Sequence, residues 1–267
     1  MTGTEKLQEL IDRSARIVFF GGAGVSTESG IPDFRSVDGL YNQQYKYPPE
    51  TIISHTFFTR RPEEFYEFYR AKMLAPDAKP NPAHLKLAEM EAAGRLSAVI
   101  TQNIDGLHQA AGSREVLELH GSVHRNYCMD CRRFYDARFI LASQGVPRCV
   151  CGGVVKPDVV LYEESLDGGT LERAVREISA CDLLIIGGTS LAVYPAAGLI
   201  RYCGGKIAVI NKSATPMDGQ ADLLVQEPIG RVLGSIRVRD PPLAWTRRPG
   251  KRTAPPPRPA RWGSLGL

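Results

Sequence analysis

Short apolar runs alternate with helical patterns along most of the chain, and this alternation restricts the fold more than any other feature. The strand-like runs lie at residues 15–20, 96–101, 116–121, 183–190, 206–211 and 221–226. Helical spacing or helix-boundary residues mark residues 5–13, 82–94, 171–182 and 229–236. Apolar strands that alternate with helices are typical of a parallel sheet covered on both faces. The sequence therefore predicts an α/β fold with a doubly wound, Rossmann-like parallel sheet.

Two segments interrupt this alternation. Residues 36–80 are rich in Tyr, Phe and Pro and have helical spacing only around 62–74, whereas residues 121–158 hold four cysteines and short strand-like pieces. We expect these insertions to form one smaller domain, helical in the first part and zinc-ribbon-like in the second. The larger domain would then comprise residues 1–35, 81–120 and 159–238.

The last residues differ from the rest in composition. Residues 239–267 carry seven Lys or Arg and one Asp, and they hold seven of the 19 prolines, so residues 1–238 have a net charge of −2 although the chain has +4. A stretch of this kind cannot form a helix or a ladder and has little to bury. We expect a disordered, solvated tail; its alternative role is contact with nucleic acid or an anionic surface. The mildly acidic body gives no reason to expect nucleic acid as the main partner.

Targeting signals are missing from the sequence pattern. The longest apolar stretches, such as Ile17–Phe20, are far shorter than the ~20 residues of a membrane span. The first residues, MTGTEKLQELIDRS, contain no apolar core like that of a signal peptide. The expectation is a cytoplasmic protein without a membrane partner.

A glycine-rich turn follows the first strand-like run. In Gly21–Ser26 the order is strand, glycine turn and helix start, which is the context of a dinucleotide-binding site. Glycines let the backbone approach a pyrophosphate, and a helix N-terminus offers N–H donors. The match to GxGxxG is partial, because Thr27 occupies the third glycine position. The alternative is a tight turn that only needs small residues.

Polar residues follow three further strand-like runs. Gln102, Asn103 and Asp105 come after the second, the turn 187–190 (Gly-Gly-Thr-Ser) comes after another, and Asn211 follows a fourth. Ligands bind beyond the carboxyl ends of strands in open α/β sheets. Asn103 alone could be a helix cap, but four polar strand ends in one sheet indicate a binding site.

Four of the six cysteines have zinc-ribbon spacing. Cys128 and Cys131 form a C-x-x-C pair, and after 17 intervening residues Cys149 and Cys151 form a tighter C-x-C pair. Four thiolates complete a tetrahedral shell, so the predicted zinc is structural. A disulfide pair is the alternative, disfavoured in a reducing compartment. We interpret Cys181 and Cys203 as small buried hydrophobic residues.

Taken together, these motifs resemble those of the sirtuins, the NAD-dependent protein deacylases. The matching stretches are GAGVSTESGIPDFR (22–35), TQNIDGLH (101–108), ELHG (118–121), the cysteine pairs, KPDVVLYEE (156–164), GGTSLAVYPAAGL (187–199) and VIN (209–211). The resemblance covers residues ~5–236 and is strongest to bacterial members that are little more than the catalytic core.

The resemblance implies a reaction in which NAD is a co-substrate. The acyl-lysine oxygen attacks C1′ of the nicotinamide ribose, nicotinamide leaves, and a histidine base activates a ribose hydroxyl that takes up the acyl group. The implied catalytic residues are His120, Asn103 and Asp105. The implied NAD-binding residues are Gly22, Ala23, Gly24, Thr27, Asp33, Phe34, Arg35, Gln102, Asn103, Ile104, Asp105, His120, Gly188, Thr189, Ser190, Asn211 and Ile229.

The histidine assignment has an alternative, because a lone His is more often structural. A neutral imidazole is a natural base for a ribose hydroxyl, and the position of His120 within ELHG favours catalysis. His124 is the nearest competitor. We interpret His55, His84 and His108 as structural or surface residues.

The substrate side is implied by the same resemblance. Val159, Val160 and Leu161 match the strand with which sirtuins pair the substrate backbone. Sirtuins that remove succinyl or malonyl groups carry a Tyr-x-x-Arg pair, and the nearest match here is Tyr69 with Lys72. Lysine keeps the charge but loses the bidentate fork of arginine, so deacetylation is favoured.

Three other functions compete with deacetylation. Mono-ADP-ribosyl transfer to protein would use the same NAD pocket. A non-catalytic sensor of NAD or acyl-lysine is disfavoured by the intact His120, Asn103 and Asp105. A zinc-dependent dehydrogenase is disfavoured because all four paired cysteines are committed to a closed metal site.

Overall fold

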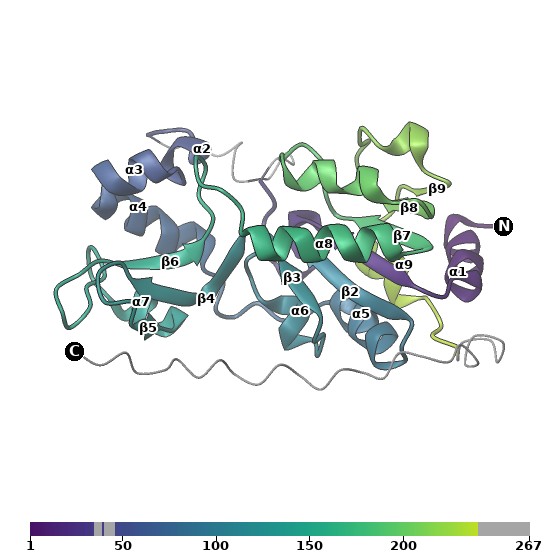
Figure 1. Cartoon of the computed structure of the whole chain (residues 1–267), viewed down its shortest axis with the longest axis horizontal. Coiled ribbons are helices and arrows are strands. Elements are labelled where there is room, and N and C mark those ends of the chain that lie inside the picture. Colours follow the sequence, from purple (N-terminus) through teal and green to yellow (C-terminus); the bar gives the residue numbers. More distant parts are fainter. Residues whose placement is uncertain (35–38, 40–45, 240–267) are drawn as a thin grey trace.

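The larger of two sheets has six parallel strands. The structure, a computed structural model, describes residues 1–34, 39 and 46–239 (Figure 1). The strands of this sheet are β1 (Ile17–Gly21), β2 (Leu96–Thr101), β3 (Val116–Glu118), β7 (Leu183–Gly187), β8 (Lys206–Ile210) and β9 (Leu223–Val225). Their order is β3-β2-β1-β7-β8-β9, so the chain builds outward from β1 in one direction and from β7 in the other. The predicted doubly wound sheet is confirmed, and its switch point lies between β1 and β7.

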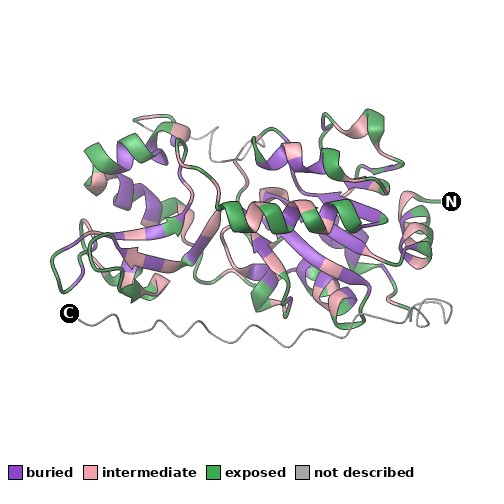
Figure 2. Ribbon diagram, viewed as in Figure 1, coloured by how far each residue is buried: buried purple, intermediate pink, exposed green. Residues whose placement is uncertain are grey.

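Helices cover both faces of this sheet. One face packs against α1 (Gly3–Arg13), α5 (Pro82–Ala92) and α9 (Ile229–Gly234), and the other packs against α8 (Gly168–Ala180) and the 3-10 helix η5 (Ala196–Tyr202). Side chains of β1 alternate between the two cores: Ile17 and Phe19 face the first, and Val18 and Phe20 face the second. Figure 2 shows the resulting pattern of buried strands and a helix α8 with an exposed outer side. Burial on both faces explains why these strands are continuously apolar.

Side-chain caps fix where the helices begin. The Thr2 side chain accepts a hydrogen bond from the Glu5 amide, and the Glu5 carboxylate accepts one from the Thr2 amide. Asn81 caps α5, whose first residue is Pro82, and Asp167 caps α8. Each cap satisfies amides that the first helical turn leaves without partners.

A smaller unit is inserted into the larger one. Its antiparallel sheet, in the order β5-β4-β6, consists of β4 (Gly121–Cys128), β5 (Phe134–Tyr135) and β6 (Val155–Val159). The helices around it are α2 (Pro49–Ile52), α3 (His55–Arg60), α4 (Pro62–Phe68) and α7 (Ala137–Ala142). Its core is strongly aromatic and includes Phe57, Phe58, Phe65, Tyr66 and Tyr69. This unit lies at one end of the molecule, on the left of Figure 1.

Local structure differs from the sequence expectation in three places. The glycine turn leads into two single 3-10 turns, Ala23–Val25 and Thr27–Ser29, and not into the expected helix. Polar Ser and Thr residues and the left-handed Gly30 leave no run of helix formers there. The helical pattern at 62–74 is divided between α4 and a π-helical turn, η4 (Tyr69–Met73). The strand expected at 116–121 stops at Glu118, and the chain enters β4 at Gly121.

The described helices include none that could cross a bilayer, since none is both long and apolar enough.

Candidate active site and metal centre

One cavity of about 1170 Å³ lies beyond the carboxyl ends of the central strands. Its walls come from the segments that follow β1, β2, β7 and β8, and from Ile53, Tyr69 and Val123 of the smaller unit. The position next to the switch point between β1 and β7 is where open α/β sheets bind their ligands. The cavity is therefore the candidate active site.

The structure brings nearly all of the predicted site residues to this cavity. The described candidates that line it are Gly22, Ala23, Gly24, Thr27, Asp33, Phe34, Tyr69, Lys72, Gln102, Asn103, Ile104, Asp105, His120, Val159, Val160, Leu161, Gly188, Thr189, Ser190, Asn211 and Ile229. Arg35 lies outside the described residues. The four paired cysteines lie apart from this lining, within the smaller unit.

Two glycines allow the turns after β1 and β7 to touch. The Gly24 amide donates a 2.8 Å hydrogen bond to the Gly188 carbonyl. Gly188 has φ +58°, and a Cβ atom there would lie 2.3 Å from the Val25 amide nitrogen. Any side chain at this position would force the turns apart, so the close contact requires glycine.

A hydrogen-bond network holds Asn103 and Asp105. The Ser26 hydroxyl donates to Asp105 Oδ2 at 2.6 Å and accepts from Asn103 Nδ2 at 3.0 Å. The Leu107 amide, at the start of α6 (Leu107–Ala110), donates to Asp105 Oδ1 at 2.9 Å. These bonds orient both polar side chains toward the cavity wall before any ligand binds.

His120 is buried and has a fixed ring. Its Nδ1 atom lies 2.9 Å from the Gln102 carbonyl oxygen. A carbonyl only accepts, so Nδ1 carries the proton and Nε2 of the neutral ring is an acceptor. Burial lowers the pKa of His120, an effect that the hydrogen bond to the Gln102 carbonyl opposes. The imidazole is therefore neutral near pH 7 and able to take up a proton.

Gln102 and Thr189 connect the ends of β2 and β7. Gln102 Nε2 donates to Thr189 Oγ1 at 3.0 Å, and this oxygen also accepts from the Leu191 amide at 3.2 Å. Asn211 Nδ2 donates to the Ser213 carbonyl at 2.8 Å, so the side chain is held beside the end of β8. Polar groups thus line the cavity across four strand ends.

Sequence reasoning missed Ser26 and gave His124 no place of its own in this site. Ser26 was not a candidate, although it is the centre of the network that holds Asn103 and Asp105. Its position inside the glycine turn was the available signal. His124, which the sequence offers only as a competitor of His120, also lines the cavity, and its Nε2 atom lies 2.9 Å from the Asp105 carbonyl oxygen. The tight packing of Gly106 on the His124 ring is a tertiary contact that no local pattern reveals.

The residues expected on the substrate side lie along one wall. Val159 ends β6, and the Val160 amide donates to the His120 carbonyl at 3.0 Å. Tyr69 is 1% exposed, and its hydroxyl has no hydrogen-bond partner among the described residues. Burial raises the pKa of this phenol, so the hydroxyl stays a neutral donor.

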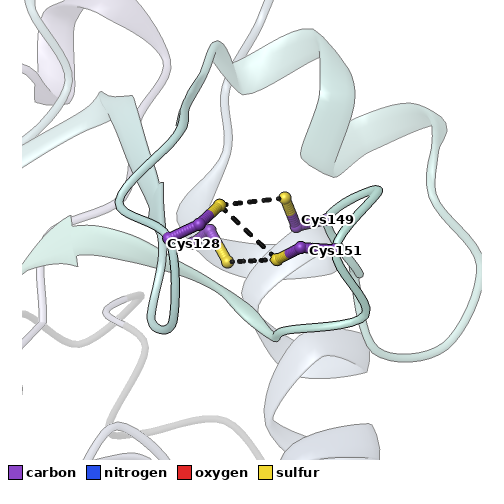
Figure 3. A group of neighbouring side chains, drawn as sticks. Cys128, Cys149 and Cys151 are labelled. Atoms are coloured by element: carbon purple, nitrogen blue, oxygen red, sulfur yellow. Dashed lines mark hydrogen bonds between the residues drawn. The ribbon is translucent and has the colours of Figure 1, made fainter. Parts of the chain in front are cut away.

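The four paired cysteines form a compact cluster. Cys128 ends β4, Cys131 follows in the next turn, and Cys149 and Cys151 lie in the loop before β6. All four sulfur atoms lie within 4.8 Å of one another, and those of Cys128 and Cys151 are 3.4 Å apart (Figure 3). Tetrahedral zinc with ~2.3 Å bonds places its sulfur ligands about 3.8 Å apart. The donor set and its spacing therefore fit a closed, structural zinc site.

Comparison with known proteins identifies the family. The family model described as "Sir2 family" matches residues 22–195. This chain belongs to the Sir2 family. Among curated sirtuins, the NAD-dependent protein deacetylase of Clostridium perfringens is 60% identical over 236 residues, which are 86% of this chain and 97% of that protein. The protein of the same name from Clostridium acetobutylicum is 58% identical and covers 86% of this chain and 96% of its own length.

Solved sirtuin structures share the fold. A structure titled "Structural Basis for the Mechanism and Regulation of Sir2 Enzymes" has a TM-score of 0.79 at 44% identity, covering 87% of this chain and 95% of that one. A Sir2 homolog–NAD complex has a TM-score of 0.78 at 39% identity, with coverages of 86% and 91%. A Sir2–p53 peptide–NAD complex has a TM-score of 0.76 at 41% identity, with coverages of 87% and 96%.

Proposed function

We propose that this sirtuin is an NAD-dependent protein lysine deacetylase that transfers the acetyl group of acetyl-lysine to ADP-ribose and releases nicotinamide. The observation that carries the proposal is the neutral, oriented His120 in a cavity whose other walls are the glycine turn and the polar strand ends. Curated relatives at 60% and 58% identity are named NAD-dependent protein deacetylases, which supports the same activity.

His120 is the proposed general base. Because Nδ1 donates to the Gln102 carbonyl, Nε2 is left to accept the proton of a ribose hydroxyl. Its lowered pKa keeps this nitrogen unprotonated at neutral pH. The bond to Gln102, itself a proposed ribose contact, ties the base to the wall that would hold the sugar.

NAD, when bound, supplies ADP-ribose as the acyl acceptor and nicotinamide as the leaving group. Asn103, Asp105 and the Ile104 backbone are proposed to bind the nicotinamide carboxamide, since Asp105 can accept from an amide and Asn103 can donate to one. The proposed contacts of the phosphates, the ribose and the adenosine half are Gly22, Ala23, Gly24, Thr27, Arg35, Gln102, Gly188, Thr189, Ser190, Asn211 and Ile229. Asp33 and Phe34 line the same cavity. The apolar Phe34 ring is proposed to exclude water from the reacting carbon.

The acetyl-lysine peptide is proposed to lie along Val159, Val160 and Leu161. Tyr69 and Lys72 line the same cavity, and they are the residues that could meet a longer acyl chain. We favour an acetyl group because Lys72 lacks the planar fork that binds a carboxylate in a bidentate way. Removal of succinyl or malonyl groups and mono-ADP-ribosyl transfer are the alternative activities of this site.

The zinc ion is proposed to have only a structural role, because four thiolates leave no open coordination position. Cys128, Cys131, Cys149 and Cys151 would hold it. Such thiolates must stay reduced, which favours the cytoplasm as the compartment.

The test is mass spectrometry of matched acetyl-lysine and succinyl-lysine peptides incubated with the protein, with and without NAD. We expect NAD-dependent loss of acetyl and the appearance of O-acetyl-ADP-ribose. Faster loss of succinyl would show a preference for acidic acyl groups and would indicate that Tyr69 and Lys72 bind their carboxylate. ADP-ribose attached to protein without loss of the acyl group would favour mono-ADP-ribosyl transfer over the proposed function. No reaction of any kind, with NAD binding retained, would favour a non-catalytic sensor.

A further inference from the structure

The segment 159–164, on which the peptide is proposed to bind, is hydrogen-bonded to His120 on one side and to the helical insertion on the other. On one side the Val160 amide donates to the His120 carbonyl at 3.0 Å. On the other side the Tyr162 amide donates to the Ile53 carbonyl at 3.0 Å, and the Tyr162 carbonyl accepts from the His55 amide at 2.9 Å. Its path therefore determines how far the peptide lies from the proposed base.

One ion pair holds both ends of the stretch Val159–Leu161, which continues from the end of β6. Lys156 Nζ donates to the Val159 carbonyl at 3.1 Å, and Glu164 Oε2 accepts from the Leu161 amide at 2.9 Å. The two side chains meet each other, with Lys156 Nζ 3.1 Å from Glu164 Oε2. Both are only 20% exposed, so this pair is much less screened by solvent than a surface pair.

The same carboxylate also reaches the helical insertion. Glu164 Oε1 lies 2.9 Å from His55 Nδ1, on the first residue of α3. Glu164 thus joins three elements: the turn after Leu161, strand β6 through Lys156, and α3 through His55. Loss of the carboxylate charge would release all three at once.

We infer that Glu164 and Lys156 form a positioning pair that presents Val159–Leu161 to the acyl-lysine peptide at a fixed distance from His120. This inference rests on the proposed function, because it assigns a role to the wall on which the peptide binds. Neither side chain needs to take part in the chemistry. The pair acts by fixing backbone groups, so its loss should weaken peptide binding and leave NAD binding unchanged.

The experiment compares steady-state kinetics of the full chain and its variants, with the acetyl peptide and NAD each varied in turn. We expect Glu164→Gln and Lys156→Met to raise the KM for peptide about tenfold, with kcat and the KM for NAD within about twofold of the wild type. Lys156→Arg keeps the charge and the donors and should restore the KM for peptide. Glu177→Gln is the matched control, because it breaks a partly buried ion pair with Arg16, at 2.6 Å, on the far side of the larger unit. It should alter Tm only.

The outcomes separate this inference from the proposed function. If the wild type shows no NAD-dependent deacetylation, the proposed function itself fails. If the wild type is active and the Glu164 and Lys156 variants change Tm but not the KM for peptide, the pair is merely structural and the inference is overturned. An equal rise in the KM for NAD, or a failure of Lys156→Arg to restore binding, also contradicts it. Should Glu164→Gln fail to fold, Lys156→Met decides, because it leaves the bonds of Glu164 to Leu161 and His55 in place.

Discussion

At the scale of single residues, the position of one proton decides what His120 can do. The Gln102 carbonyl fixes that proton on Nδ1, and burial lowers the pKa of the ring. Both effects favour a neutral imidazole with a basic Nε2. A histidine in the same sequence position but in water would lack both the orientation and the shifted pKa.

We predict that His120→Ala lowers kcat for deacetylation by about a hundredfold or more, the usual contribution of a general base. The change should leave Tm near that of the wild type and NAD binding measurable by calorimetry. In the wild type, kcat/KM should fall as pH drops through the pKa of His120, which lies below the ordinary value of 6.5. Activity of the variant close to that of the wild type would remove His120 from the mechanism.

Ser26 illustrates a residue that acts through its neighbours. Its hydroxyl connects Asp105 to Asn103, so Ser26→Ala should loosen both side chains. We expect the KM for NAD to rise about tenfold, as for the loss of a hydrogen bond to a charged group. Ser235→Ala is the control, because among the described residues the Ser235 hydroxyl bonds to the Val232 carbonyl at the end of α9 and to no group of the cavity. Equal kinetics in the two variants would show that the network is not needed.

At the scale of elements, α5 and α6 meet through two buried histidines. The rings of His84 and His108 lie 4.7 Å apart and are 0% and 1% exposed. Burial lowers the pKa of both, and that of His108 to about 3. The folded protein therefore keeps them neutral at a pH where an unfolded chain already binds protons.

The consequence is a loss of stability in acid. Above the unfolded pKa of about 6.5 neither state is protonated and stability is unaffected. As pH falls from about 6.5 toward 3, His108 binds a proton in the unfolded state but stays unprotonated in the folded state. The free energy of unfolding therefore decreases by up to about 1.4 kcal/mol per pH unit. The free energy of unfolding, measured with denaturant between pH 7 and 4, should decrease less steeply with falling pH in His108→Leu than in the wild type. Identical slopes in the two proteins would refute this account.

The cysteine loops are a second element whose stability depends on one group. We predict one zinc per chain by atomic absorption, and a lower Tm after chelation or in Cys128→Ser, because the free energy of structural zinc binding is folding free energy. Cys203→Ser changes a cysteine outside the cluster and should retain zinc. A melting curve that does not change upon chelation would contradict the metal site.

At the scale of the whole molecule, the site exists because two units face each other. The strand ends of the larger sheet supply the glycine turn, Asn103 and Asp105, and the smaller unit supplies Tyr69 and Ile53. Deleting residues 240–267 should leave kcat/KM and Tm unchanged, since the described lining of the cavity comes from residues between 22 and 229 and Arg239 keeps its ion pair with Asp12. A large loss of activity in the truncated protein would assign the tail a role in the site. The residue boundaries of the two units remain a prediction, which limited proteolysis can test.

The sequence by itself determined the doubly wound sheet, the glycine turn and the cysteine pairs, whereas the role of His120 came from the resemblance to the sirtuins. These features follow from local patterns: continuous apolar strands, glycines between a strand and a turn, and the spacing of thiols. The same local signals failed after Gly22, where a helix was expected and two 3-10 turns formed. The Ser and Thr residues and the left-handed Gly30 of this stretch favour turns over a continuous helix.

Tertiary structure alone decided how these pieces act together. Ser26 and Asp105 are 79 residues apart in the chain, and His55 and Glu164 are 109 apart, yet each pair is in hydrogen-bond contact. Such contacts arise from the packing of whole elements, and neither propensity nor periodicity carries information about them. The same holds for the lowered pKa values of His84, His108 and His120, because burial by distant segments, and not the neighbouring sequence, removes water from each ring.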